Sequence, residues 1–240
     1  MKAFLNLRYA VPARRNALVK GLQRVGLKPV DGLPVNPVEG DVFITWNRIG
    51  SANNWARMFE RNGWPVLVVE NATWGNDFVG DRWYHIARTY HNTAGCYPVG
   101  GPERWDSLEV PLAPFRCTGD TVILLQRGIG SPPTKMPAKF VAKVIKHHKG
   151  ARIRRHPGKR EVNPLQNELR NTARVVTWGS GAAVWALQRG VHVTSYMPNW
   201  IGEQDNTVEG RLQMFRRLAW AQWTLHEIEQ GQPFHRLLAQ

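Results

Sequence analysis

Short apolar runs alternate with longer amphipathic stretches in the first seventy residues of the chain. The apolar runs predict strands, and the stretches with an apolar residue every three or four positions predict helices. Alternation of this kind is typical of βαβ units around a parallel sheet. The expected strands are Ala3–Leu7, Asp41–Thr45 and Pro65–Val69, and the expected helices are Pro12–Val25 and Ala52–Arg61.

The pattern changes after Asn71. A segment rich in glycine, asparagine and tryptophan continues to Pro114, and within it Trp83–Ala87 has the composition of a strand. Loop-rich segments of this length inside a compact domain usually carry a functional or binding surface. We therefore expect residues 71–114 to contribute to ligand binding.

The alternation returns at Thr121 and predicts a second unit of the same kind. A final helix is expected over Gly210–Gln230, because its apolar residues recur at near-helical spacing. The other expected elements are the strands Thr121–Leu125, Ala151–Arg155, Arg174–Thr177 and Val191–Thr194, and the helices Pro137–His148, Pro164–Arg170 and Gly181–Arg189.

Together these patterns predict an α/β protein with two Rossmann-like domains that face a cleft. The predicted domains are residues 1–118 and 119–240, with the C-terminal helix packing across. Ligands of open α/β sheets bind beyond the carboxyl ends of the strands. Polar side chains that directly follow a strand are therefore the first candidates for function.

Basic residues outnumber acidic ones by a wide margin. The chain has 32 Lys and Arg against 18 Asp and Glu, a formal net charge of +14. Residues 119–240 hold 18 of the basic and 8 of the acidic side chains, so most of the excess lies there. Lys139, Lys143 and Lys146 follow one face of a predicted helix. A polyanionic partner fits this balance, although a charged solvent face is the ordinary explanation for one helix.

Several function classes are not indicated. No apolar run approaches the roughly 20 residues of a membrane span, and the first residues lack the apolar core of a signal peptide. We expect a soluble cytoplasmic protein without integral membrane association. The two cysteines, Cys96 and Cys117, form no CxxC or Cys/His cluster, so neither a zinc site nor a disulfide framework is expected.

One candidate site follows the expected strand Ala151–Arg155. The sequence Arg154-Arg155-His156-Pro157-Gly158 places arginines and a histidine in a turn at the carboxyl end of this strand. Arginine and histidine donate hydrogen bonds to phosphate oxygens. The alternative is a solvated basic turn, because Pro-Gly by itself marks only a loop.

A second candidate site follows the expected strand Arg174–Thr177. The segment Val175–Ala183 runs from a buried strand through a turn containing Ser180 and Gly181 into an alanine-rich helix. The first N–H groups of a helix attract anions, and Ser180 adds a hydroxyl. The alternative makes Ser180 the cap of that helix.

The His-Pro-Gly and Gly-Ser-Gly pair resembles the nucleotide-binding half of GT-B glycosyltransferases, in particular the capsule-polysaccharide (Kdo transferase-like) and bacterial sialyltransferase group. The resemblance implies that His156 and Ser180 contact the phosphate of a nucleotide-sugar donor. Arg127, Arg155 and Gly181 are candidates for the same phosphate. Trp185 stands where the group has an acidic residue, which leaves ribose recognition open.

A further resemblance lies in the first half of the chain. The segment Val66–Gly75 is similar to the Glu-Asp-Gly segment of the capsule enzymes, with Glu70 at the first acid and Asn71 in place of the second. Glu70 is thus the candidate general base, and Asp77, Asp81 and His85 are reserve candidates. The alternative is a loop carboxylate paired with an arginine. The resemblance implies no metal requirement and no tightly bound cofactor, because the nucleotide sugar is a co-substrate.

The acceptor is the least specified part of the prediction. The leading hypothesis is a hydroxymethylated base in DNA, modified by a phage-encoded enzyme in the host cytoplasm. Basic tracks and stacking rings are what nucleic-acid grooves use. Two alternatives are a surface polysaccharide or lipid-linked sugar, and a non-catalytic nucleic-acid-binding protein on a GT-B scaffold. The residues expected to bind nucleic acid are Lys139, Lys143, Lys146 and Arg154.

Overall fold

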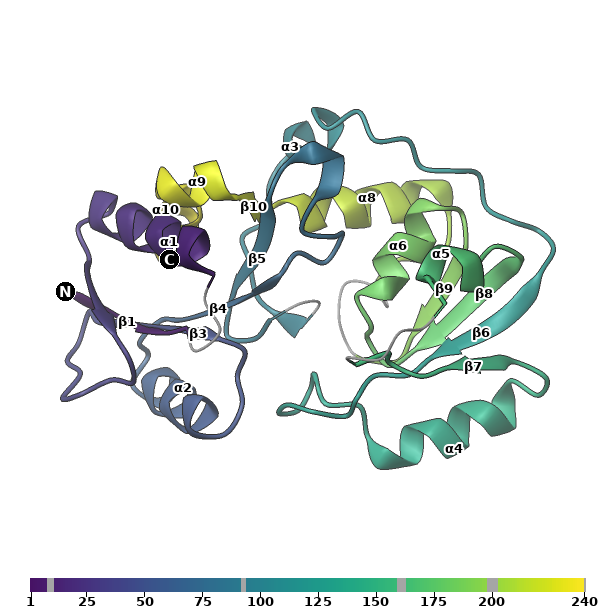
Figure 1. Ribbon diagram of the computed structural model, residues 1–240, viewed down its shortest axis with the longest axis horizontal. Helices are drawn as coiled ribbons and strands as arrows, with labels where there is room; N and C mark the ends of the chain where they lie inside the picture. Colours follow the sequence, from purple (N-terminus) through teal and green to yellow (C-terminus); the bar gives the residue numbers. More distant parts are fainter. Residues whose placement is uncertain (8–10, 92–93, 159–162, 198–202, 240) are drawn as a thin grey trace. The chain divides into compact units, whose positions relative to one another are not determined.

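The chain forms two compact units in the computed structural model. The structure describes residues 1–7, 11–91, 94–158, 163–197 and 203–239. One unit contains Met1–Gly101 and Arg217–Gln240, and the other contains Pro102–Arg216. Each unit is built on one sheet (Figure 1). We call the six-stranded sheet of the first unit sheet A and the four-stranded sheet of the second unit sheet B.

Sheet A has the strand order β10-β5-β4-β3-β1-β2. The strands β1, β2, β3 and β4 are parallel to one another, whereas β5 is antiparallel to both β4 and β10. These strands are β1 (Lys2–Asn6), β2 (Lys28–Asp31), β3 (Val42–Trp46), β4 (Val66–Asn71), β5 (Trp83–Arg88) and β10 (Gln222–Thr224).

The two faces of sheet A are covered by different helices. Side chains alternate between the faces along each strand, so Leu5 and Ile44 lie in one apolar cluster while Phe4 and Phe43 lie in another. The helices α1 (Pro12–Arg24), α9 (Leu225–Glu229) and α10 (Gln232–Leu238) supply the first cluster, and α2 (Ser51–Arg61) supplies the second.

Sheet B is entirely parallel, with the order β7-β6-β8-β9. Phe140 and Val144 of α4 pack against Ile123 and Val176 of the sheet, and Figure 1 shows α6 on the opposite face. The strands are β6 (Asp120–Leu124), β7 (Arg152–Arg154), β8 (Thr172–Thr177) and β9 (His192–Ser195). The helices are α3 (Glu103–Asp106), α4 (Ala138–His147), α5 (Leu165–Glu168), α6 (Ala182–Gln188) and α8 (Val208–Ala219), which continues past the boundary of the unit.

In both sheets, the direction in which successive strands are added reverses after the second strand. The second strand of each unit lies on one side of the first strand, and the third strand lies on the other side. Such a reversal leaves a switch point at the carboxyl ends of the first and third strands, where ligands of open α/β sheets bind. The prediction of Rossmann-like units is therefore confirmed for each unit taken by itself, with sheet B parallel throughout and sheet A parallel in four of its six strands.

The prediction of one helix over Gly210–Gln230 is wrong. The helix α8 ends at Ala219, β10 follows, and α9 starts at Leu225. Trp223 is buried in the core of sheet A, so pairing with β5 outweighs the helical periodicity of this segment. The sequence held a signal for the break: Thr224 and Glu227 form a capping box, in which each side chain accepts a hydrogen bond from the backbone N–H of the other residue.

The division of the chain also differs from the predicted boundary at residues 118 and 119. The first segment of the first unit ends at Gly101, and its second segment begins at Arg217. The C-terminal segment belongs to it because β10 extends sheet A, and because Ile228 and Phe234 complete the cluster under α1. The second unit is thus an insertion between two segments of the first.

The packing of α1 on α9 depends on a glycine. A Cβ atom at Gly21 would lie 1.9 Å from the carbonyl oxygen of Ile228, which is backbone and cannot rotate away. We expect Gly21→Ala to force the two helices apart and to lower the free energy of unfolding by about 1–3 kcal/mol, the usual cost of overpacking. Urea denaturation measures this loss.

Asn16→Ala, at an exposed position of the same helix, is the matched control. It should leave the free energy of unfolding unchanged or slightly higher, because alanine favours helix. Equal stability of Gly21→Ala and the unaltered protein would contradict the account of this contact.

Candidate functional site

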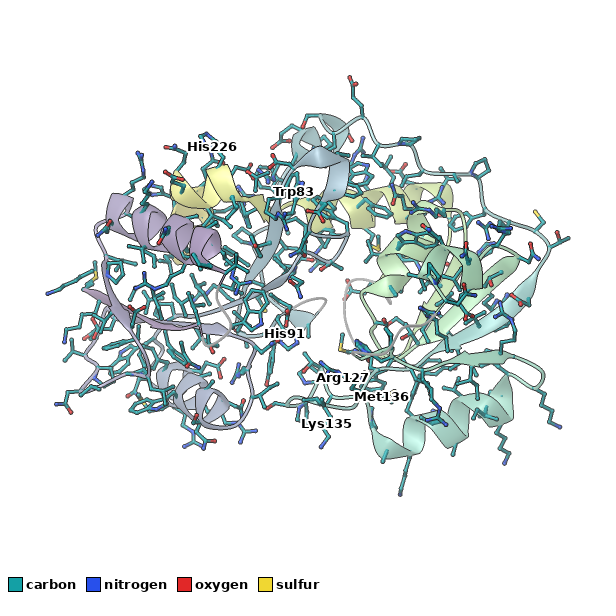
Figure 2. All side chains as sticks on the ribbon, in the orientation of Figure 1. Trp83, His91, Arg127, Lys135, Met136 and His226 are labelled. Atoms are coloured by element: carbon teal, nitrogen blue, oxygen red, sulfur yellow. The ribbon has the colours of Figure 1, made fainter. Side chains whose placement is uncertain are left out.

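The carboxyl edge of sheet B gathers the residues that follow three of its strands. Gln126 and Arg127 follow β6, Arg155 and His156 follow β7, and the turn 178–181 follows β8. Because the strands are parallel, these segments leave the sheet on the same side. Figure 2 shows Arg127 in the loop between β6 and α4, near Lys135 and Met136. We call residues 126–127, 155–156 and 178–181 the sheet B edge.

The two ring nitrogens of His156 have different roles: Nδ1 accepts a hydrogen bond within the turn, and Nε2 is available to a ligand. Its Nδ1 atom accepts a hydrogen bond from the backbone N–H of Gly158 at 2.9 Å, so the ring proton resides on Nε2. Burial and the positive charge of Arg127 lower the pKa of His156 below its ordinary value. The side chain is exposed. A neutral imidazole with an available N–H donor therefore stands beside an arginine.

The turn after β8 is tied to the neighbouring strand. The hydroxyl of Thr177 donates to the carbonyl oxygen of Leu124 at 3.0 Å and accepts from the backbone N–H of Ser180 at 3.2 Å. The Oγ atom of Ser180 accepts from the backbone N–H of Ala182 at 3.3 Å. The N-cap position of α6 is occupied by Gly181 and has no side-chain cap, so Ser180 lies one residue before the cap. A contact from Ser180 to a phosphate stays a prediction.

Gly179 is buried in this turn and packs against the side chain of Met197. A Cβ atom there would lie 2.5 Å from the Cε atom of Met197. The backbone N–H of Met197 also donates to the carbonyl oxygen of Trp178 at 2.6 Å. The turn is thus fixed against the segment after β9, and this places Ser180 and Gly181 at the sheet B edge.

Arg154 and Arg155 have different environments although they are adjacent. Arg154 lies in β7 with its side chain 12% exposed, and its Nη1 atom is 3.3 Å from Glu168 Oε1 and donates to the carbonyl oxygen of Asn163 at 2.9 Å. This pairing does not fit the prediction that Arg154 binds nucleic acid. Arg155 is exposed and stays a candidate for a phosphate. The sequence did not reveal the partner, because Glu168 lies on a separate helix.

Glu70 lies at the carboxyl end of β4 in the first unit. The side chain is half-buried, and its Oε1 atom accepts a hydrogen bond from the backbone N–H of Asn71 at 2.9 Å. Its charge acts on the guanidinium of Arg14: burial lowers the pKa of Arg14, and Tyr84 and Glu70 oppose that shift. The structure therefore supports an arginine near this carboxylate, and Glu70 as a base stays a prediction.

Arg14 and its aromatic neighbours were missed in the sequence. The Cζ atom of Arg14 lies 3.7 Å from the ring centre of Trp46 and 5.2 Å from that of Tyr84. Arg14 stands in the first turn of α1, and Trp46 is the last residue of β3. In a parallel sheet, residues at the carboxyl ends of strands and at the starts of the following helices gather at one edge. This rule was the signal in the sequence that could have identified Arg14 and Trp46 as neighbours.

The three reserve candidates for catalysis, Asp77, Asp81 and His85, have different environments. Asp77 is largely exposed and lies 3.3 Å from Arg82 in an ion pair. Asp81 Oδ1 accepts a hydrogen bond from the backbone N–H of Arg82 at 2.6 Å. His85 is fully buried in β5, so it cannot touch a substrate. The prediction of His85 as a catalytic residue is therefore corrected: its ring has a structural position.

The lysines of α4 lie where the sequence analysis expected them. Lys139, Lys143 and Lys146 are exposed, while Phe140 and Val144 face the sheet. In the part of the chain that the structure describes, no three His, Cys, Asp or Glu side chains come close enough to hold a metal ion. Among the described residues, no helix has the length and apolar character of a membrane span.

The comparisons with known proteins give a likeness in fold. No protein-family model and no curated protein sequence matches the chain. The structure resembles KpsC from Thermosulfurimonas dismutans, a β-Kdo 2,4 transferase, with a TM-score of 0.52 and 14% identity over 93% of this chain and 92% of that chain. At this identity the likeness shows the fold alone. The expected resemblance to a Kdo transferase is confirmed at that level.

A second solved structure is far less similar. Aspartate transcarbamoylase from Trypanosoma cruzi matches with a TM-score of 0.28 and 15% identity over 92% of this chain and 82% of that chain. A TM-score this low carries no argument about fold or function.

The buried histidine makes stability depend on pH. Burial, with a smaller effect from His91, lowers the pKa of His85 to about 3, whereas an unfolded histidine titrates near pH 6.5. Between these values the unfolded chain binds a proton that the folded chain does not. We therefore expect the free energy of unfolding to fall as the pH drops from about 6.5 toward 3, by up to about 1.4 kcal/mol per pH unit from this residue.

Urea denaturation at a series of pH values measures the slope. His85→Leu should have a shallower slope than the unaltered protein, because it removes the proton-binding difference. His147→Leu, at an exposed position of α4, should keep the original slope. Identical slopes for His85→Leu and the unaltered protein would show that His85 is not buried as a neutral ring.

Proposed function

We propose that this chain is a glycosyltransferase that moves a sugar from a nucleotide-sugar donor to a hydroxyl group. The observation that carries the proposal is the sheet B edge, where exposed Arg127 and Arg155 flank a neutral His156 whose Nε2–H is available. This edge lies at the switch point of a parallel sheet, the usual ligand position of such folds. The likeness in fold to a β-Kdo 2,4 transferase supports the same reaction class.

The donor half of the reaction is assigned to the second unit. In the transfer, the bond between the sugar carbon and the phosphate oxygen breaks, and negative charge grows on the departing nucleotide phosphate. Arg127, Arg155 and the Nε2–H of His156 would stabilise this charge by hydrogen bonds that strengthen as it develops. Ser180 and Gly181 would add donors from the turn before α6. Because neutral His156 donates without first taking up a proton, its role does not require acidic conditions.

The acceptor half is assigned to Glu70. The acceptor hydroxyl forms the new bond to the sugar carbon and loses its proton, which Glu70 would receive as general base. A carboxylate at the end of β4 stands where ligands approach sheet A. Its Oε1 atom accepts a hydrogen bond from the N–H of Asn71, which orients the carboxylate. Aspartates 77 and 81 are exposed on the next loop and are the alternatives for this role.

For the acceptor itself we propose a hydroxymethylated base in DNA. The support is the net charge of +14 and the exposed lysines at 139, 143 and 146 on α4. A surface polysaccharide or lipid-linked sugar is the second candidate, in keeping with the substrate class implied by the motif resemblance. A phage-encoded enzyme acting on DNA in a host cell is the setting that we propose for this reaction.

Mass measurement on digested products tests the reaction. The protein is incubated with a panel of nucleotide sugars and with DNA that contains 5-hydroxymethylpyrimidines, and the DNA is then digested to nucleosides. A gain of one sugar mass supports both donor and acceptor. Release of nucleotide without a gain on DNA supports the transferase and directs the search to glycans and lipids. Neither product with any donor, and no protection of the protein from heat by nucleotides, would favour the non-catalytic binding protein.

His156 gives a prediction about donor binding. We expect His156→Ala to weaken nucleotide-sugar binding by about 10- to 150-fold, because a hydrogen bond to a charged group contributes about 1.5–3 kcal/mol. Calorimetric titration with the donor measures the change in Kd. His147→Ala is the matched control, since His147 is also an exposed histidine of this unit. Unchanged binding by His156→Ala would remove the residue from the donor site.

Glu70 gives a prediction about turnover. Glu70→Gln keeps the size of the side chain and removes the base, so we expect kcat to fall by about 10²–10⁴-fold while donor Kd stays the same. Initial rates and calorimetry on the same preparation separate the two quantities. Glu103→Gln, in the short helix α3, is the matched control. Full turnover by Glu70→Gln would transfer the role of base to another carboxylate.

A further inference from the structure

Three side chains form a row across sheet A at the position of Glu70. The residue paired with Glu70 on β5 is His85, and the residue paired with His85 on β10 is Gln222. Directly paired residues of neighbouring antiparallel strands project from the same face, with Cβ atoms about 4.5–5.5 Å apart. His85 and Gln222 are completely buried, while Glu70 is half-buried.

Hydrogen bonds determine which ring nitrogen of His85 carries the proton. The Oε1 atom of Gln222 accepts from the backbone N–H of Thr73 at 2.9 Å, so its amide NH₂ must point the other way. That NH₂ lies 2.6 Å from Nδ1 of His85. An amide NH₂ can only donate, so Nδ1 carries the lone pair and the ring proton is on Nε2. The Thr73 hydroxyl lies 3.3 Å from the same Nδ1 and can donate to it as well.

The row thereby reaches the turn that follows Glu70. Thr73 comes three residues after Glu70, and its N–H is bound by Gln222. The rest of the turn is held by Asn76, whose Oδ1 atom accepts from the N–H of Ala72 at 3.0 Å and whose Nδ2 atom donates to Asn71 Oδ1 at 3.1 Å. The N–H of Asn71 is in turn the donor to the Glu70 carboxylate. A shift of Thr73 would therefore be transmitted to the group that orients this carboxylate.

We propose that His85 and Gln222 are positioning residues for Glu70: they hold the turn 71–76 through Thr73 and so fix the direction of the carboxylate. The proposal rests on the proposed function in assigning the base to Glu70. In this role His85 uses only its Nδ1 atom. The strand β10 contributes to this arrangement, since it carries the amide that joins His85 to the turn.

The use of one nitrogen makes the proposal sharply testable. The Nε2 atom of His85 has no hydrogen-bond partner among the described residues, so the contribution of the ring is made through Nδ1. The Oδ1 atom of asparagine lies close to the position of a histidine Nδ1 atom, whereas the longer glutamine places its oxygen near Nε2. His85→Asn should keep the acceptor for Gln222, and His85→Gln and His85→Leu should lose it.

The first readout is the amide exchange rate of Thr73, measured by nuclear magnetic resonance on the full chain. We expect an increase of about tenfold or more in His85→Gln and His85→Leu, because the hydrogen bond that holds the Gln222 amide in place for the N–H of Thr73 is lost. His85→Asn should stay within about threefold of the unaltered protein. If packing volume alone mattered, glutamine would substitute better than asparagine, so the opposite ranking would overturn the proposal.

The second readout is turnover together with donor binding. His85→Leu should lower kcat by up to about 10²-fold, the effect of a misplacement near 1 Å, should leave donor Kd unchanged, and should be rescued by His85→Asn. Thr45→Val is the matched control: it removes a fully buried hydroxyl, bonded to Asn6 at 3.1 Å and to the carbonyl oxygen of Asn47 at 2.9 Å, that does not bind the turn 71–76. It should change neither the exchange of Thr73 nor kcat.

The outcomes separate this inference from the proposed function. Faster exchange of Thr73 with full turnover in His85→Leu, while Glu70→Gln is inactive, would overturn the positioning role and leave the base in place. Full turnover in Glu70→Gln would overturn the base, and the exchange of Thr73 would still decide whether the row holds the turn. Should His85→Leu fail to fold, Gln222→Leu removes the same bonds from the other side and carries the same expectations.

Discussion

Parallel strand pairing is the constraint on which the candidate sites depend. A parallel sheet brings the carboxyl ends of its strands to one edge, so residues that are about thirty to fifty positions apart in the chain lie beside one another there. In sheet B this gathers segments after β6, β7 and β8. The bond from Thr177 to the carbonyl oxygen of Leu124 then fixes the start of the last segment against the first strand. The basic edge follows from the topology together with three short loops.

The distribution of acidic residues determines which arginines remain available. On β7, Arg152 is bound to Asp120 and Glu168, and Arg154 is bound to Glu168. The carboxylates thus neutralise the arginines within the strand, while Arg155, one position beyond it, stays exposed. The excess of positive charge in this half of the chain is therefore not spread evenly over its arginines. At the end of β7, Arg155 is therefore the arginine that we propose an anionic donor would meet.

The sequence was most informative where local pattern and tertiary structure agree. The core strands β1, β3, β4, β6 and β8 were predicted because each is a run of apolar residues buried on both faces. Lys28–Asp31 was missed because it is an edge strand with a single strongly apolar residue, Val30, and a proline. Gln222–Thr224 was assigned to a helix because its spacing is helical, and only its partner β5 makes it a strand.

The candidate residues show the same limit. His156, Ser180 and Glu70 could be singled out because each lies at or shortly after the carboxyl end of a strand. The pairing of Arg154 with Glu168 and the burial of His85 depend on neighbours that no local pattern identifies. The packing of Arg14 on Trp46 joins a helix start to a strand end, which sequence spacing alone does not bring together. Side-chain partners across elements are therefore the part that required the structure.

We propose that the sheet B edge binds the phosphate of a nucleotide donor through His156. Histidine ring resonances, recorded by nuclear magnetic resonance during titration with cytidine, uridine and adenosine phosphates, measure this binding. At least one nucleotide should shift the His156 Nε2 resonance with saturation, while the His147 resonances stay unchanged. Saturable binding that moves other histidines and leaves His156 unaffected would exclude His156 from the donor site.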